Sequence, residues 1–338
     1  MSNKIIGLTL LFISFTGGWA WMDYRQALHA PVVRDNSVVI EIVKGDSMTR
    51  IAEKLAEQHL KVSALWFKII ALQKQSAAKL KTGEYEFTTG LTLPEIIDQI
   101  AEGKTRQHSI TFPEGWSLAE ILAEMKSNPH IQHTLNETSP EVLRAHIGIT
   151  ESKTEGLFFP DTYFFEKNMS DVSLLKRAYD KMQSVLQEEW PQRTANLPLN
   201  SPYEALILAS IIEKETGAEE ERPLIAGVMV RRLQKGMPLQ TDPTVIYGMG
   251  DNYHGNIGEQ DLKNPTPYNT YLIKGLPPTP IAMPGRDAIH AALHPDTGNS
   301  LYFVAKGNGT HVFSSTLQDH NHAVKLFQKQ KNDQYRTR

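Results

Sequence analysis

The order of apolar and polar positions divides the chain into three parts: a continuous apolar run, a region of short repeated patterns, and a longer region of helices and proline-rich loops. Residues 5–22 carry no charged side chain over 18 positions. At the helical rise of about 1.5 Å per residue, this run nearly matches a hydrocarbon core of roughly 30 Å. The run therefore predicts a helix that can span a membrane.

The flanks of the apolar run indicate its orientation. Aromatic side chains suited to the outer interface lie near its end: Trp19, Trp21 and Tyr24. Lys4 and the N-terminal amine place the near side in the cytoplasm. Gly18 and Ala20 also fit a cleaved signal peptide, but the run is longer than the roughly 7 to 15 residues of a signal core. We predict an uncleaved anchor with a cytoplasmic stub at residues 1–25, and the remainder outside the cytoplasm.

A polar linker at 26–37 precedes a pattern that occurs three times. Each copy contains an alternating strand, a glycine turn, a Ser or Thr, and an amphipathic helix. The shared positions are Ile40, Ile42, Gly45, Ser47, Ile51 and Leu55, then Tyr85, Phe87, Gly90, Thr92, Ile96 and Ile100, then Ile110, Phe112, Gly115, Ser117, Ile121 and Met125. The glycine supplies the turn and the hydroxyl caps the helix.

The first copy contains a second helix, at about 63–76, before a returning strand at 84–87. This strand, helix, helix, strand unit resembles a LysM-type glycan-binding module over residues 38–103. A plain α+β spacer would show the same pattern, so the alternative stays open.

The stretch 201–217 predicts a buried helix that ends in two carboxylates. A Ser-Pro pair opens it, a glycine closes it, and only one of the eight residues 205–212 is polar. Glu213 and Glu215 therefore lie in the last turn of a core helix. There, desolvation and the negative end of the helix dipole both favour the protonated form, which general acid catalysis requires. The alternative is an ordinary solvated helix end.

Polar and aromatic residues that could line a site lie before and after this helix. The aromatic run 157–165 follows Glu155. Its rings could stack on sugars, but we expect most of them to pack in the core, and Tyr163 is best able to offer a hydroxyl. Residues 237–250 predict an extended, proline-punctuated segment with several hydrogen-bonding side chains. Residues 264–285 hold six prolines and predict a stiff loop. Further elements are expected as helices at 171–189, 219–235 and 286–293, a hairpin at 301–314, and a final helix from 317.

Composition narrows the classes of function. The chain has 338 residues, 40% hydrophobic and 22% charged, which is enough for two or more domains. A net charge of -3 gives no indication of nucleic-acid binding, and the absence of cysteine excludes disulfides and thiolate chemistry. His290 and His294 have helical spacing, with His320 and His322 nearby, but no HExxH string accompanies them. We predict surface or capping histidines and neither a metal nor a cofactor.

Five strings in fixed order carry a resemblance to a known family: EGLFFPDTY, LASIIEKET, LQTDPTVIYGMG, PYNTYLIKGLPPTPIAMPG and YFVAKGNGTHVFSSTLQDH. Together with the anchor and the LysM-like segment, they resemble the YceG-like family of murein transglycosylases over nearly the whole chain. The resemblance implies that the first glutamate of LASIIEKET, Glu213, is catalytic, whereas the residues alone leave Glu213 and Glu215 as alternatives. It also implies nascent peptidoglycan glycan strands as substrate, a role in ending strand growth, and membrane-bound cell-wall synthases as partners.

The resemblance implies a mechanism that uses one carboxylic acid, whereas ordinary glycosidases use two. Glu213 would protonate the oxygen between MurNAc and GlcNAc and then accept the C6 hydroxyl proton as that oxygen attacks C1, which leaves a 1,6-anhydro end. The expected substrate-binding residues are Gln240, Thr241, Asp242, Tyr247, Asn269, Glu155 and Tyr163. The alternatives are a two-carboxylate muramidase, a non-catalytic peptidoglycan-binding scaffold and a metal hydrolase.

The predicted fold class is α+β, with a single transmembrane helix at 1–25, a LysM-like repeat-bearing domain at 38–150 and a larger catalytic domain at 151–338. The resemblance and the apolar run together place the protein in the bacterial inner membrane, with its catalytic domain in the periplasm. Lipid bilayer and peptidoglycan are the expected partners, and nucleic acid is not.

Overall fold

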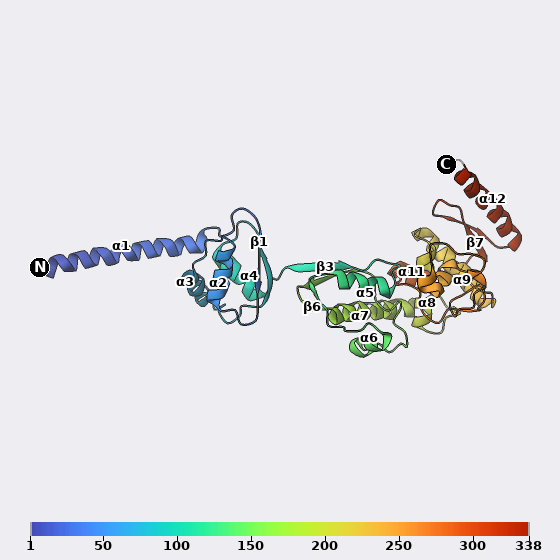
Figure 1. The fold of residues 1–338 in the computed structure, drawn as a ribbon, viewed down its shortest axis with the longest axis horizontal. Coiled ribbons are helices and arrows are strands. Elements are labelled where there is room, and N and C mark those ends of the chain that lie inside the picture. The colour runs from blue at the N-terminus through green and yellow to red at the C-terminus, as the bar shows by residue number, and fades with distance from the viewer. Residues whose placement is uncertain (1, 337–338) are drawn as a thin grey trace. The chain divides into compact units, whose positions relative to one another are not determined.

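The computed structural model describes residues 2–336 and has mixed α and β structure, as predicted (Figure 1). The chain separates into two compact units. Unit 1 comprises the chain up to His108 together with Phe164–Asn168, and unit 2 comprises Ser109–Tyr163 and the chain from Met169. The predicted boundary at residue 150, between a repeat-bearing domain and a catalytic domain, stays a prediction.

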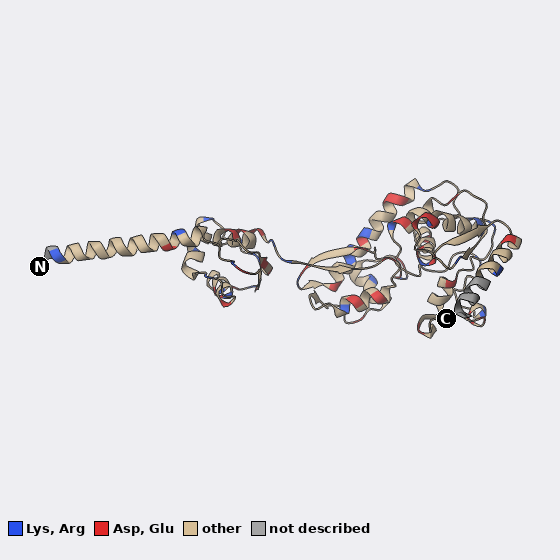
Figure 2. Cartoon of the chain, turned by 90° about the horizontal axis from the view of Figure 1, so that it is seen from above, with Lys and Arg blue, Asp and Glu red and all other residues tan. Residues whose placement is uncertain are grey.

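Helix α1 (Ser2–His29) begins the chain and is long and apolar enough to cross a membrane. Figure 2 shows no charged residue between the lysine near its start and its last turns. The helix continues past residue 25, and Tyr24, Ala27 and Leu28 pack against the core of unit 1. The polar linker expected from residue 26 is therefore wrong over its first residues, because apolar side chains in this part of the helix cover the core.

Unit 1 encloses its own hydrophobic core. Its elements after α1 are β1 (Val38–Ile42), α2 (Met48–Glu57), α3 (Ala64–Gln73), β2 (Gly83–Phe87) and α4 (Leu93–Glu102). The two strands pair antiparallel, with Ile40 opposite Tyr85. The core includes Phe67, Phe87 and Ile97, which are fully buried. The unit thus has the predicted strand, helix, helix, strand order.

The threefold repeat is confirmed. Its glycines, Gly45, Gly90 and Gly115, adopt left-handed φ angles of 100°, 92° and 77°. The hydroxyl residues Ser47, Thr92 and Ser117 are the N-caps of α2, α4 and α5 (Leu118–Ser127), respectively. Because L side chains disfavour such φ angles, glycine is the residue that these turns require.

Unit 2 is mainly helical. Its helices and strands are α5 (Leu118–Ser127), β4 (Ile131–Gln132), α6 (Pro140–Ile147), β6 (Met169–Ser170), α7 (Asp171–Glu189), α8 (Pro202–Glu215), α9 (Arg222–Gln234), α10 (Asp242–Met249), α11 (Arg286–Leu293), β7 (Tyr302–Ala305), β8 (His311–Ser314) and α12 (Leu317–Arg336). Short 3-10 helices occupy Trp190–Gln192, Glu219–Glu221, Gly250–Asn252 and Asp261–Lys263. Strand β3 (Gln107–Thr111) pairs with β5 (Thr162–Glu166), β4 pairs parallel with β6, and β7 forms a hairpin with β8.

Helix α8 is the centre of unit 2 and packs against α7, α9, α10 and α11. All eight residues from Ala205 to Ile212 are buried, which confirms the predicted core helix. The extended segment expected at 237–250 is wrong over its second half, which forms α10. Thr241 is the N-cap of that helix and Pro243 lies in its first turn, where proline is compatible with helix.

Candidate active site

The C-terminal end of α8 holds the two candidate acids. Ser210 Oγ accepts the backbone N–H of Ile281 at 3.0 Å, which ties the proline-rich loop to the last turns of the helix. The helix ends at Thr216, its C-cap. Glu213 and Glu215 therefore lie between a residue that is bonded to the proline-rich loop, Ser210, and the C-cap of the helix.

The carboxyl group of Glu213 is nearly enclosed, since 6% of its side chain is exposed. Its Oε2 accepts the backbone N–H of Gly285, the N-cap of α11, at 2.9 Å. Its Oε1 lies 3.5 Å from Nη2 of Arg222, the first residue of α9. A backbone donor and a buried cation thus hold one oxygen each.

Arg222 contacts three carboxyl groups. Besides Glu213, its guanidinium lies 3.8 Å from Glu114 and 3.5 Å from Asp287. The Glu114 and Asp287 side chains are 49% and 70% exposed. One cation cannot neutralise three carboxylates, and ionisation is most costly for the most buried of them. The arrangement therefore favours a proton on Glu213.

The electrostatics of Glu213 support both of its protonation states. Burial raises the pKa of Glu213 above its usual range, and the carboxylates of Glu114 and Asp287 raise it further. The Gly285 N–H and the Arg222 guanidinium oppose this rise by stabilising the ionised form. Such a group can donate a proton and remain stable after donation, which is the requirement for acid catalysis followed by base catalysis.

Two glycines let backbone approach this carboxyl group closely. A Cβ on Gly285 would lie 1.8 Å from Oε1 of Glu114, so a larger residue requires Glu114 to move. The N–H of Gly115 donates to the carbonyl of Met283 at 2.8 Å, and its own carbonyl accepts Nζ of Lys214 at 3.1 Å. The turn of the last repeat copy is thereby held against the end of α8.

Glu215 has different surroundings, although it lies two residues further along the same helix. Burial raises the pKa of Glu215 to about 8, and the carboxylate of Asp242 adds to the rise. Asp242 itself accepts the hydroxyl of Tyr271 at 2.7 Å. Within the part of the chain that the structure describes, no hydrogen bond or cation stabilises an ionised Glu215. Glu215 is therefore held in its neutral form.

Thr241 and Asn269 shape the loops near this second acid. Both residues are 1% exposed. The N–H of Thr241 donates to Oγ1 of Thr270 at 3.0 Å, and its own Oγ1 donates to Oγ1 of Thr244 at 3.4 Å. Asn269 donates from Nδ2 to the carbonyl of Asn264 at 2.8 Å and accepts the N–H of Tyr271 at 3.0 Å. Their polar side-chain atoms are already bonded within the protein.

Three further predicted residues are less buried. Gln240 is exposed, adopts a left-handed φ of 55°, and accepts Nη1 of Arg232 at 3.2 Å. Glu155 accepts the N–H of Leu118, in the first turn of α5, at 2.9 Å, and the hydroxyl of Tyr247 at 3.2 Å. Burial raises the pKa of Glu155 as well. Glu155 and Tyr247 therefore form a pair of their own.

The aromatic run 157–165 packs mainly in the core, as expected. Tyr163 is 4% exposed, its hydroxyl donates to the carbonyl of Phe159 at 2.6 Å, and its ring lies 5.2 Å from that of Phe112. Phe164, at 60%, is the exposed exception. The hydroxyl of Tyr163 is thus used inside the protein.

The structure surrounds Glu213 with residues that the sequence did not single out: Arg222, Glu114, Asp287 and Gly285. Most of the predicted substrate-binding residues lie in the two segments around Asp242 and Asn269 and in the Glu155–Tyr247 pair, whereas Tyr163 lies in the core. One local signal for Arg222 was present, because an arginine in the first turn of a helix opposes the helix dipole and so indicates a tertiary partner.

Among the described residues, one group of three could hold a metal ion: Glu189, His290 and His294, with ligand atoms within 4.8 Å of one another. Glu189 already accepts Nη1 of Arg286 at 2.8 Å and contacts Nδ1 of His290 at 3.0 Å. The histidine pair was visible in the sequence, but its carboxylate neighbour was not. His290 lies in α11 and His294 is its C-cap, so both are further along the chain than the N-cap Gly285 that contacts Glu213.

Comparisons with known proteins place the chain in a family. The model of the YceG-like family matches residues 40–326. The chain is 32% identical over 329 residues to the endolytic murein transglycosylase of Bacillus subtilis (strain 168), which covers 92% of this chain and 91% of that protein. It is 26% identical over 353 residues to the protein of the same name from Streptococcus pneumoniae serotype 2 (strain D39), over 93% of this chain and 63% of that protein.

A solved structure agrees with these similarities. The crystal structure of a putative yceG-like protein from Listeria monocytogenes matches with a TM-score of 0.55 and 28% sequence identity, over 86% of this chain and 100% of that one. Because the family model spans most of the sequence, the chain belongs to the YceG-like family.

Proposed function

We propose that this chain is an endolytic murein transglycosylase, the activity for which its relatives are named, and that Glu213 is its proton donor. The observation that carries the residue assignment is the burial of Glu213 against Arg222, a cation shared with Glu114 and Asp287. These two more exposed carboxylates mark the side from which solvent and a glycan strand reach the buried acid.

The chemistry follows from the contacts of Glu213. Oε2 accepts the Gly285 N–H at 2.9 Å, whereas Oε1 has only the longer contact of 3.5 Å with Arg222, so the proton resides on Oε1. Glu213 gives this proton to the oxygen that joins MurNAc to GlcNAc, and the bond from C1 to that oxygen breaks. Gly285 and Arg222 then stabilise the carboxylate. The carboxylate accepts the C6 hydroxyl proton as O6 bonds to C1, so a 1,6-anhydro ring closes, no water is consumed and the acid is restored.

Glu215 is less suited to this cycle, although its pKa of about 8 keeps it protonated at neutral pH. A proton shuttle must be stable in both forms, and burial beside Asp242 stabilises only the neutral one. We assign Glu215 a structural role, as an uncharged residue at the C-terminal end of α8.

Two of the three alternative functions, the muramidase and the scaffold, fit the structure less well. In a two-carboxylate muramidase Asp242 would be the second carboxylate, but Asp242 bonds Tyr271 and interacts with Glu215. In a non-catalytic scaffold, a buried acid that shares one cation with two further carboxylates would reduce stability without a function. The transglycosylase accounts for both features.

Residues around the two acids would position the glycan. Gln240 and Asp242 are the exposed predicted contacts. Glu155 and Tyr247 are half-buried and bonded to each other, and Asp242 accepts the hydroxyl of Tyr271. The other three predicted residues would contribute by shaping the binding site and not by direct hydrogen bonds to the glycan, since their polar side-chain atoms are bonded within the protein: Thr241, Asn269 and Tyr163.

Unit 1 is proposed to be a LysM-type module that binds peptidoglycan, supported by its strand, helix, helix, strand order and antiparallel pair. Helix α1 would hold the chain in the inner membrane with its N-terminus in the cytoplasm and its catalytic domain in the periplasm. From there the enzyme would end the growth of nascent strands made by membrane-bound synthases.

The test is digestion of purified glycan strands by the full-length chain, with mass spectrometry of the products. We expect 1,6-anhydro ends from the wild type and from Glu204→Gln, a matched change at the other end of α8, and almost none from Glu213→Gln. Reducing ends would instead establish a hydrolase, and intact glycan in every sample would favour the scaffold.

A further inference from the structure

Helix α3 in unit 1 has an apolar face that the described residues leave largely uncovered. Leu65 and Leu72 are 60% and 61% exposed, and Ile69, which is half-buried, lies between them on the same face. The buried residues of the helix point to the opposite side: Phe67, Ile70 and Ala71. Isolated exposed leucines are ordinary on a soluble protein, but an exposed apolar stripe along one helix indicates a partner.

Two hydrogen bonds fix α3 across the end of α1. Nε1 of Trp66 donates to Asp23 at 2.7 Å, and the hydroxyl of Tyr24 donates to Oε1 of Gln73 at 2.6 Å. The two partners on α3 are seven positions apart, or about 10 Å along a helix, whereas Asp23 and Tyr24 are neighbours. Helix α3 therefore crosses α1 instead of running beside it.

The exposed face of α3 looks toward the apolar part of α1. Ala27 and Leu28, one turn beyond Tyr24, pack against the core of unit 1, so the core lies on the C-terminal side of the crossing. Because the buried side of α3 faces that core, its exposed side faces the other way. Figure 1 shows α3 on the side of unit 1 from which α1 departs, and β1 on the opposite side.

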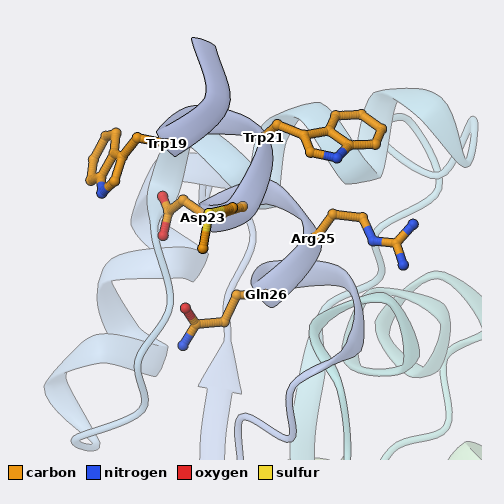
Figure 3. A pocket seen from close by; sticks show the side chains of 6 residues that line it. Trp19, Trp21, Asp23, Arg25 and Gln26 are labelled. Atoms are coloured by element: carbon orange, nitrogen blue, oxygen red, sulfur yellow. The ribbon is translucent and has the colours of Figure 1, made fainter. Parts of the chain in front are cut away.

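The chemistry at this level of α1 is that of a membrane surface. Trp19 and Trp21 are 65% and 61% exposed. Figure 3 shows both rings projecting from the helix, with Arg25 and Gln26 further along. Tryptophans followed by charged and polar residues are typical of the boundary between hydrocarbon and water. On α3, Lys68 lies between the two leucines in sequence, where its ammonium group can reach lipid phosphates.

We propose that α3 lies in the plane of the membrane, with Leu65, Ile69 and Leu72 in the interfacial layer of the lipid. The proposal rests on the proposed membrane span of α1, to whose end α3 is bonded. In this arrangement α3 holds unit 1 against the bilayer surface at a fixed depth, so unit 1 does not move freely above the membrane.

The absence of cysteine from the natural chain allows a direct test. Leu65→Cys and Leu72→Cys are each labelled with an environment-sensitive fluorophore in the full-length chain, which is reconstituted into vesicles that contain anionic phospholipid. Val43→Cys is the matched control, because Val43 is also an exposed apolar residue, at 47%, and follows β1 on the other side of the unit. Quenching by aqueous iodide and by nitroxide-bearing lipid is measured for all three.

The expected result at positions 65 and 72 is a blue-shifted emission, with loss of iodide quenching and gain of quenching by nitroxide lipid. Position 43 should keep its iodide quenching and show neither the blue shift nor lipid quenching. Equal iodide quenching at all three positions, in protein that carbonate-washed vesicles retain, would refute the interfacial position of α3 but not the membrane span of α1. Loss of the protein from washed vesicles would refute both the membrane span of α1 and the interfacial position of α3. Protection that grows with the protein-to-lipid ratio would identify a second copy of the chain as the partner and also overturn the proposal.

Discussion

Glu213 and Glu215 are carboxylic acids in the last turn of one buried helix, yet their surroundings differ. Glu213 has a backbone donor from α11 and a guanidinium from α9. Glu215 has no such partner among the described residues, and Asp242 places a like charge near it. Burial raises the pKa of both acids. The difference is that the ionised form is stabilised only at Glu213.

This comparison shows why a raised pKa by itself does not identify a catalytic acid. Burial stabilises the neutral form, which a proton donor needs before reaction. The conjugate base must then survive in the same place until it takes a proton back, and that requires a donor or a cation. On this criterion Glu213 is suited to turnover, and Glu215 to a fixed neutral state.

The strongest test of the difference is loss of each acid in turn. Glu213→Gln keeps the shape and loses the proton, so turnover should fall by about 10²- to 10⁴-fold. Glu215→Gln should lose less than about tenfold, because a neutral amide resembles the neutral acid. Release of anhydro products measures both, with thermal unfolding as the control for folding. A dead Glu215→Gln beside an active Glu213→Gln would reverse the assignment.

Arg222 should set the pH range of activity. The rate is expected to fall as pH rises through the raised pKa of Glu213, because the acid ionises. Arg222→Met removes a cause that lowers this pKa, so the alkaline limb should move to higher pH while turnover drops by about 10- to 100-fold, or roughly 1.4 to 2.7 kcal/mol. A pH profile of kcat measures the shift.

Two variants control for loss of packing at Arg222. Arg222→Lys keeps the charge and should leave the limb near its wild-type position. Arg231→Met, in the same helix, breaks bonds to the carbonyls of Ser300 and Asp296, so it should lower stability without moving the limb. If the alkaline limb of the Arg222→Met profile did not shift, Arg222 would not influence the pKa of the catalytic acid.

Glu215 should influence stability more than rate. Its pKa is about 8 in the fold, against an ordinary value of 4.5 in the unfolded chain, so between these values the folded chain binds more protons than the unfolded one. Stability should therefore fall as pH rises from about 4.5 to about 8, by at most about 1.4 kcal/mol per unit. Relative to wild type, Glu215→Gln should gain on the order of a few kcal/mol in unfolding free energy between pH 5 and pH 8.

Urea unfolding at both pH values measures this gain. Asp242→Asn should produce part of it, because it removes the smaller cause of the shift. A stability difference between Glu215→Gln and wild type that is independent of pH would mean that Glu215 is ionised in the fold.

The smallest effect is expected at Tyr247. Tyr247→Phe removes the hydrogen bond to Glu155 and should cost about 1 kcal/mol of stability, with turnover changed by less than tenfold. Thermal unfolding and product release measure the two effects. A loss of turnover as large as that of Glu213→Gln would move the catalytic centre toward the Glu155–Tyr247 pair.

The sequence was sufficient wherever local physics decided the outcome. The apolar run of α1, the buried helix α8, the bounds of α7 and α11, and the glycine turns of the repeat follow from periodicity, caps and backbone preference, which act over a few residues. The exceptions were segments with tertiary partners. Helix α1 extends over the core of unit 1, and α10 replaces the expected extended segment.

The surroundings of the candidate acids were decided by tertiary structure alone. The motif that resembles the family indicated Glu213, but only the fold brings Arg222, Glu114 and the N–H of Gly285 to it from three separate parts of the chain. Sequence spacing fixes what lies within one helical turn, and it carries no information on which distant residue will approach. A pKa and the stability of a conjugate base depend on such distant neighbours, so the helix was predictable and the difference between its two acids was not.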